Sequence, residues 1–491
     1  MQKGMNHEKA DCGRLGDALQ AIIPALEEFS RYAEPDQTAT HQKEWKSAVE
    51  KPLPQKGEGL DTVLSELSET VIPNGLRIGM PGFSGWVTTS PTTSAVVANL
   101  AGSVAGSQRW MVQPFNTIER IALEWLAELL GIPSEWQGTF SSGGSVANII
   151  GLAAARQHAF EKIGLDPARE GVQNVENWRI YSSSEVHHVS IRAAAVLGLG
   201  RNSVVQIPPD DAFRLDIKAL KSILVRHKKK GIRPLAIIAT TGTVNTGAID
   251  PLLPIADLAD EFGAWLHVDG AYGGFGILDE RIAYLFEGLD RARSFAVDPH
   301  KWLAAPVGIG ATFVRDKALL GRALTLEPAE YLEGTSLAGE VTSAFDQLGE
   351  VFHDYNLEQS APSRGVSVWA ILKEIGAEGV RDRVVRHNDF ARRVQHMAEE
   401  DERLEVLSPA TLSICCFRYL AEGKDDGALN ELNLEIARRL RAEGRLVPST
   451  TEINGKITIR PCYINPRGTR AEVDALVRRV RELGDKIVSN Q

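Results

Sequence analysis

Cysteine is scarce in this chain of 491 residues, which contains only four copies. Cys12, Cys415, Cys416 and Cys462 are too few and too irregularly placed for a disulfide framework, and none has the CxxC spacing of a metal site. No other His, Cys or carboxylate set has ligand spacing, so we expect no metal. Sparse thiols are typical of a reducing compartment, and we expect a cytoplasmic protein.

Positive charge is in deficit as well. The chain has 54 Lys and Arg residues against 64 Asp and Glu residues, a net charge of −10 and a pI near 5.7. This balance argues against a nucleic-acid-binding role. The short basic run His227–Lys230 fits the solvated end of a helix. No apolar run approaches the length of a membrane span, and the first residues do not resemble a signal peptide.

The length and composition of the chain are those of a soluble protein with two or three lobes. It is 43% hydrophobic and 24% charged. Apolar residues at helical spacing predict helices over Leu15–Tyr32 and Leu60–Ile72, separated by a polar stretch. Strand-like runs then alternate with helices, as in a doubly wound sheet. A long helical stretch, Ser367–Glu402, leads into a final segment that is typical of a small α+β domain.

The stretch SFAVDPHKWLAAPVGIG (Ser294–Gly310) places Lys301 where an apolar strand gives way to a turn. Most lysines are solvated surface residues. A partly desolvated lysine, however, is a nucleophile that forms a Schiff base with an aldehyde. Just upstream, LHVDGAYGG (Leu266–Gly274) carries Asp269 at the end of another apolar run. A Schiff-base lysine with an aspartate for the pyridine nitrogen is the pair that pyridoxal 5′-phosphate (PLP) needs.

With these paired HVDGAY and DPHKW motifs, the sequence from about Pro81 onward resembles the group II PLP-dependent amino acid decarboxylases, which include aromatic L-amino acid and glutamate decarboxylases. The resemblance implies an α/β protein of the aspartate aminotransferase-like fold type I, with a mostly parallel seven-stranded sheet and a small C-terminal α+β domain. It implies an N-terminal helical segment (1–85) that packs on the partner of a homodimer, a PLP-binding domain (86–375) and the small domain (376–491).

A phosphate cradle is expected in GTFSSGGSVANIIGLAAAR (Gly138–Arg156), where a strand ends in a glycine turn before a helix. Unpaired N–H groups and the helix dipole favour an anion there, and Gly144 and Ser145 are the expected contacts. The resemblance implies that Ser294, upstream of the lysine, helps to hold the phosphate and that His300, next to the lysine, approaches it. Local turn hydrogen bonds are the alternative role for both.

Three further residues are expected around the cofactor ring. Ala271 is small enough to lie under the ring face, and Thr243 is expected to contact Asp269 or the ring edge, unless its hydroxyl only caps a turn. The resemblance implies a histidine stacked on the ring. His188 fits the spacing to the residues that follow, whereas His187 remains open because the usual basic residue then falls at Ala193 and not at Arg192.

The resemblance also indicates substrate-side residues. Trp86 and Thr89 lie in the loop Pro81–Thr92, with Thr89 a partner for the substrate carboxylate, although Met80 replaces a histidine common in relatives. Trp86 and Trp110 favour an aromatic substrate, whereas Gly106 and Gln108 argue against one. The proton donor for the reacting carbon is expected to be Tyr331, with Tyr355 as the competing candidate.

The sequence thus predicts a PLP-dependent amino acid decarboxylase that forms an amine and CO2, with an aromatic L-amino acid as the favoured substrate and Lys301, His188 and Tyr331 as catalytic residues. Two alternatives are also PLP-dependent enzymes: an aldehyde synthase that also deaminates oxidatively, and a decarboxylase of a non-aromatic amino acid such as glutamate or diaminobutyrate. A PLP-binding protein without catalysis is a third, disfavoured by the presence of lysine, aspartate, histidine and tyrosine together.

Overall fold

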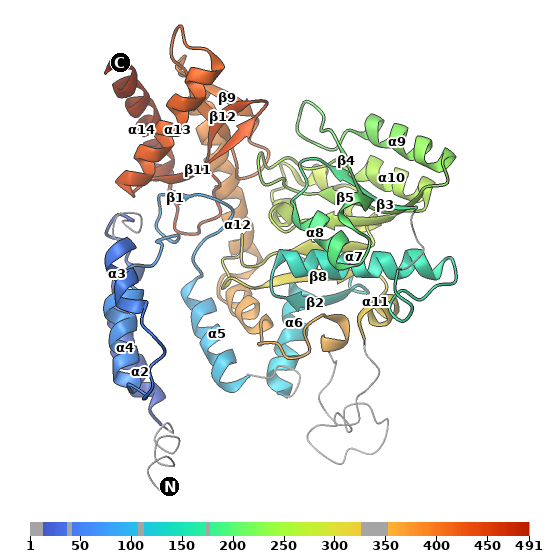
Figure 1. Ribbon diagram of the computed structural model, residues 1–491, viewed down its shortest axis with the longest axis horizontal. Coiled ribbons are helices and arrows are strands. Elements are labelled where there is room, and N and C mark those ends of the chain that lie inside the picture. Colours follow the sequence, from blue (N-terminus) through green and yellow to red (C-terminus); the bar gives the residue numbers. More distant parts are fainter. Residues whose placement is uncertain (1–12, 37–41, 107–111, 173–176, 326–351, 491) are drawn as a thin grey trace.

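The computed structural model describes residues 13–36, 42–106, 112–172, 177–325 and 352–490. These residues form a large lobe on a seven-stranded sheet and a small lobe on a five-stranded sheet. A group of N-terminal helices extends below the small lobe and stands apart from the large one (Figure 1). The predicted seven-stranded sheet and small C-terminal α+β domain are confirmed.

The large sheet is mostly parallel. In spatial order its strands are β2 (Gln137–Ser141), β8 (Gly310–Val314), β7 (Ser294–Val297), β6 (Trp265–Asp269), β5 (Arg233–Thr240), β3 (Trp178–Ser183) and β4 (Val204–Ile207). Only β8 runs against its neighbours. The central strands are buried on both faces, which explains their near-continuous apolar sequences. Because all strands but β8 run in the same direction, their C-terminal ends lie at one edge of the sheet.

Helices cover both faces of this sheet. One face packs against α7 (Gly144–Glu161), α8 (Val189–Val196) and α11 (Lys317–Leu324). The other face packs against α6 (Gln113–Leu129), α9 (Ile217–Lys229), α10 (Leu252–Phe262) and the start of α12 (Gly365–Glu399). Short helical turns complete the connections: η3 (Arg201–Ser203), η4 (Gly273–Leu278), η5 (Ala283–Phe286), η6 (Leu289–Arg291) and η9 (Phe352–Tyr355).

The long helix α12 runs from the large lobe into the small one. Gly376, with φ of 65°, interrupts it at the predicted domain boundary. The small sheet has the order β1 (Phe83–Ser84), β11 (Val447–Ile453), β12 (Lys456–Arg460), β10 (Cys416–Tyr419) and β9 (Leu404–Ser408). It is covered by α13 (Asp426–Glu443) and α14 (Arg470–Ser489). Strand β1, which the sequence did not predict, ties the loop after residue 80 to this lobe through parallel pairing with β11.

The N-terminal helices expose their apolar side chains. They are α2 (Leu15–Ser30), α3 (Gln42–Val49), α4 (Leu60–Glu66) and the continuing turn η1 (Leu67–Val71). No residue of α2 or α4 is buried. The apolar face of α5 (Thr93–Ala105) is exposed too, at Val96, Val97, Leu100 and Val104. These apolar side chains are therefore in contact with solvent in the single chain.

Candidate active site

A cavity of about 340 Å³ opens at the edge where the parallel strands end. It is lined by the turns that follow β2, β3, β5, β6 and β7 and by the loop before β8: Ser142, Gly143, Gly144, Ser145, Asn148, His187, Val189, Thr240, Gly242, Val244, Asp269, Ala271, Tyr272, Asp298, His300, Lys301, Val307 and Gly308. Ligands of open α/β sheets bind at this edge. The cavity brings together six predicted residues: Gly144, Ser145, Asp269, Ala271, His300 and Lys301.

The glycine turn between β2 and α7 forms one wall of the cavity. Gly143 has φ of 119°, a conformation that side chains rarely adopt. A Cβ atom on Gly144 would lie 2.5 Å from Asp298 Oδ2, so only glycine fits. The first N–H groups of α7 lack intrahelical partners and lie at the positive end of the helix dipole. This turn can therefore hold an anion.

Lys301 lies in the turn after β7 and forms an ion pair within that turn. Its Nζ is 3.0 Å from Asp298 Oδ2, with side chains 20% and 2% exposed. The neighbouring His300 contacts the carbonyl oxygen of Ile309 through Nδ1 at 2.7 Å. The lysine amine is thus partly removed from water and aimed at a buried carboxylate.

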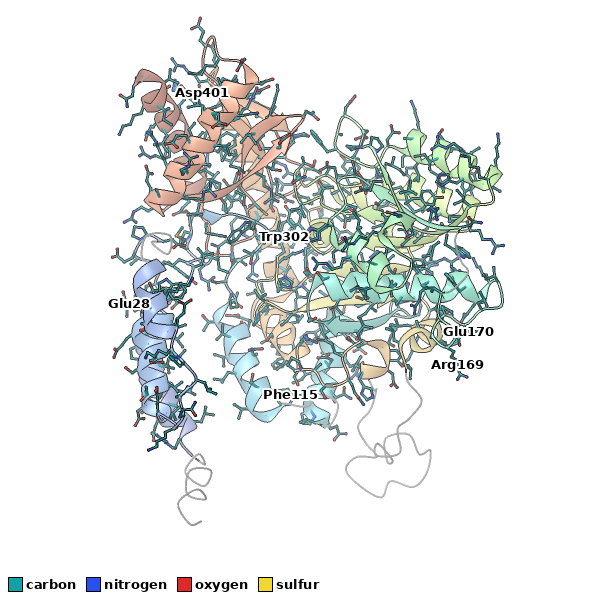
Figure 2. The ribbon with its side chains drawn as sticks, viewed as in Figure 1. Glu28, Phe115, Arg169, Glu170, Trp302 and Asp401 are labelled. Atoms are coloured by element: carbon teal, nitrogen blue, oxygen red, sulfur yellow. The ribbon has the colours of Figure 1, made fainter. Side chains whose placement is uncertain are left out.

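Asp269, the last residue of β6, is buried, and its Oδ1 accepts a hydrogen bond from the Ala271 N–H at 3.1 Å. Tyr272 stacks on Trp302, the residue after the lysine, with ring centroids 5.4 Å apart. Trp302 lies in the interior between the two lobes (Figure 2), where its Nε1 donates to His387 Nδ1 at 2.9 Å. The two motifs that the sequence singled out are therefore packed together.

The structure brings His187, and not His188, into the cavity lining. His188 is the residue before α8, and its ring centroid lies 4.1 Å from that of His187. Of the two candidates for the stacking histidine, the one that lines the cavity is His187, the alternative that kept Arg192 in register. Burial, followed by the neighbouring His188, lowers the pKa of His187.

Two other expected cofactor contacts lie behind the lining. Thr243 Oγ1 is buried, lies 2.9 Å from Thr246 Oγ1 and accepts from the Ala248 N–H, so its hydroxyl holds a turn. Ser294 begins β7, at the opposite end from Lys301, and its hydroxyl contacts Trp265 and His267. The expectation that Ser294 holds the phosphate is wrong in geometry, because the strand separates it from the glycine turn.

The expected substrate contacts also lie outside the lining. Thr89 is fully buried, and Trp86 is 60% exposed and lines a separate cavity of about 320 Å³. Tyr355 belongs to η9, where Lys317 lies over its ring, and does not line the site. Tyr331, Gln108 and Trp110 lie outside the described residues.

Several lining residues were not predicted: Ser142, Gly143, Asn148, Val189, Thr240, Gly242, Val244, Tyr272, Asp298, Val307 and Gly308. Most of them lie within a few residues of a predicted one, so proximity to the motifs was the available signal. Asp298 in DPHKW and Tyr272 in HVDGAY are examples. Among the described residues, no cluster of three or more His, Cys, Asp or Glu side chains suits a metal ion, and no helix is long and apolar enough to cross a membrane.

Comparison with known proteins gives the family. Residues 43–420 match the model of the pyridoxal-dependent decarboxylase conserved domain. The aromatic-L-amino-acid decarboxylase of Bacillus atrophaeus is 31% identical over 441 residues, which cover 89% of this chain and 88% of the relative. The L-2,4-diaminobutyrate decarboxylase of Rhizobium meliloti is 28% identical over 445 residues, covering 88% and 84%.

A solved structure has the same fold. The crystal structure of Oryza sativa TDC with PLP and tryptamine superposes with a TM-score of 0.88 at 22% identity, covering 97% of this chain and 99% of that one. The chain belongs to the pyridoxal-dependent decarboxylase family. It is a PLP-dependent amino acid carboxy-lyase of fold type I, as the sequence predicted.

Buried histidines make the stability of this protein sensitive to acid. Burial lowers the pKa of His267 to about 4 and that of His387 well below its ordinary value. The pKa of histidine in an unfolded chain is about 6.5. The stability from each neutral histidine is therefore complete above that pH and is lost as the pH falls through the folded pKa.

We expect His387→Gln to remove part of this dependence, because glutamine can accept from Trp302 without titrating. Between pH 6 and pH 5, roughly, the free energy of unfolding of the wild type should fall by about 1.4 kcal/mol per pH unit more than that of the variant. Urea unfolding across this range measures the difference. The solvent-exposed His396→Gln, in the last turn of α12, is the control. Parallel pH profiles for the wild type and His387→Gln would contradict the prediction.

Proposed function

We propose that this protein decarboxylates an aromatic L-amino acid to the corresponding amine and CO2, with PLP bound in the cavity at the edge of the large sheet. The observation that carries the proposal is the convergence of an amine, a buried carboxylate and an anion-binding turn in one cavity, at Lys301, Asp269 and Gly143–Ser145. When bound, PLP supplies an electron sink for the bond that breaks.

The residues present fit this cofactor. The glycine turn, in which a Cβ atom on Gly144 has no room, suits a phosphate that takes hydrogen bonds from the first turn of α7. Lys301 Nζ is the amine that would hold the aldehyde carbon. Asp269 would keep the pyridine nitrogen protonated by charge pairing. His187 and Ala271 would lie against the ring faces, because both line the cavity between these anchors.

The environment of Lys301 suits its role in binding and release. Asp298 Oδ2, 3.0 Å from Lys301 Nζ, gives the amine a fixed orientation. The remaining exposure of the lysine, 20%, lets a substrate amine reach the same carbon. The proton donor for the product stays a prediction from the sequence, Tyr331, since Tyr355 does not line the cavity.

Charge in the cavity favours an apolar side chain. Among the described lining residues, the acids are Asp269 and Asp298, which the cofactor nitrogen and Lys301 engage, and no arginine is present. These described residues thus offer no guanidinium to a glutamate side chain and no further carboxylate to a diaminobutyrate side chain. Val244, Val307 and Tyr272 supply apolar surface. The 31% identity to an aromatic-L-amino-acid decarboxylase supports the same choice.

We also infer that the working unit is a homodimer with the cavity at its interface. The first residue before α5, Thr92, donates through its N–H to Ala304 O in the loop after Lys301, so α5 adjoins the site. The valines of α5 are exposed, and so is Val307, a lining residue of the cavity that is 69% exposed. A second copy that covers this apolar surface would close the cavity.

A product screen tests the function. Purified protein reconstituted with PLP is offered each common L-amino acid, DOPA and diaminobutyrate, and CO2, amine, aldehyde, ammonia and peroxide are quantified. We expect one amine per CO2, with an aromatic substrate turned over fastest, and no multiple turnover by Lys301→Ala. Aldehyde with stoichiometric peroxide would instead make the protein an aldehyde synthase, and fastest turnover of diaminobutyrate or glutamate would refute the aromatic assignment.

The dimer is tested at α5. We expect Val97→Asp combined with Val104→Asp to convert the protein to monomers and to abolish most activity, because a buried charge in an apolar interface is costly. Sedimentation velocity measures the mass. The control is Val225→Asp, at an exposed valine of α9, a helix on the other side of the large lobe from α5 (Figure 1). A wild type that sediments as a monomer with full activity would disprove the proposal.

A further inference from the structure

A chain of buried hydrogen bonds runs from the start of the strands to the glycine turn. Trp265 Nε1 donates to Ser294 Oγ at 2.7 Å, and Ser294 Oγ lies 2.8 Å from His267 Nδ1. His267 Nε2 lies 2.8 Å from Asn148 Oδ1, and Asn148 Nδ2 donates to Gly144 O at 2.8 Å. All four side chains are buried, from 0 to 1% exposed.

The chemistry of the two ends fixes the direction of every bond. An indole N–H only donates, so Ser294 Oγ accepts from Trp265. The Asn148 amide donates to a carbonyl through Nδ2, so its Oδ1 must accept from His267 Nε2–H. In the neutral imidazole, Nδ1 is then an acceptor, and it accepts a hydrogen bond from the Ser294 hydroxyl. One tautomer of His267 satisfies the whole chain.

The helix is shaped to let this histidine in. A Cβ atom on Gly151 of α7 would lie 2.6 Å from His267 Cε1 and 3.2 Å from Ser294 Oγ. Strands β6 and β7 pair in register at His267 and Ser294, which puts the two side chains side by side beneath the helix. Gly151 thus allows α7 to approach both strands closely enough for Asn148 to reach the imidazole.

We infer that His267, with Ser294 and Asn148, is a positioning residue for the anion-binding turn at the start of α7. Asn148 lines the cavity and holds Gly144 O, while His267 holds Asn148 from the sheet. The chain therefore fixes where the first N–H groups of α7 point. His267 also lies two residues before Asp269 on β6, so one strand sets both the phosphate end and the ring end of the cavity.

This explains what Ser294 contributes from the start of β7: its hydroxyl orients the imidazole of His267. The imidazole acts while neutral, which agrees with the lowering of its pKa by burial. The inference rests on the proposed placement of the cofactor phosphate in the glycine turn. It makes no claim about the substrate.

The test compares cofactors with and without a phosphate. Apoprotein is titrated with PLP and, separately, with pyridoxal, followed by cofactor absorbance and tryptophan fluorescence. We expect His267→Phe to weaken PLP binding by about tenfold or more, because the Asn148 and Ser294 groups lose their partner. Pyridoxal binding should change little, because pyridoxal has no phosphate for the glycine turn to hold. Gly151→Ala, which displaces the imidazole, and Ser294→Ala should shift PLP affinity in the same direction, and these serve if His267→Phe does not fold.

The matched control is Thr312→Val. Thr312 Oγ1 donates to Ala147 O at 2.8 Å. This is another buried hydrogen bond from the sheet to the first turn of α7, but it does not involve Trp265, Ser294, His267 or Asn148. Equal losses for PLP and pyridoxal, an equal loss in Thr312→Val, or unchanged PLP affinity in the variants would overturn the inference. If the wild type itself does not prefer PLP to pyridoxal, the proposed phosphate placement fails instead.

Discussion

The close approach of two turns, the glycine turn before α7 and the turn that carries Lys301, is the constraint on which the rest of the site depends. Gly144 leaves no room for a side chain against Asp298, and a Cβ atom on Gly310 would lie 2.6 Å from the carbonyl carbon of Gly143. The first turn of α7 and the amine of Lys301 are thereby held in one cavity, as the proposed cofactor site requires. The parallel strands on either side then deliver Asp269 and His187 to the same edge.

The small lobe is coupled to this arrangement through buried polar contacts. Trp302 donates to His387 of α12, and His387 Nε2 contacts the carbonyl oxygen of Asn465 at 3.1 Å. The Asn465 side chain in turn donates to the carbonyl oxygen of Met80 at 2.7 Å. The lysine turn, the small lobe and the loop after residue 80 thus share one network. Motion of the small lobe is therefore expected to change the position of the turn that carries Lys301, because buried polar networks have few alternative arrangements.

Sequence reasoning predicted the fold class, because alternating apolar strands and helices are typical of it, and the paired motifs pointed to residues that line one cavity. It failed where the direction of a side chain decides whether a residue reaches the cavity. Ser294 and Lys301 lie seven positions apart in one motif, but at opposite ends of the strand-turn unit, so only Lys301 reaches the cavity. His187 and His188 are adjacent, and the turn before α8 decides which one lines the cavity. Strand β1 was missed since its two residues pair with a partner more than 360 positions away.

The most direct test of the account is to locate the covalent attachment of the cofactor. Protein reconstituted with PLP is reduced with borohydride, digested, and its peptides are mapped by mass spectrometry. The account predicts one pyridoxyl group per chain on the peptide that contains Lys301, and loss of that label in Lys301→Ala. A label carried mainly by another lysine, or a stoichiometric label that persists in Lys301→Ala, would contradict it.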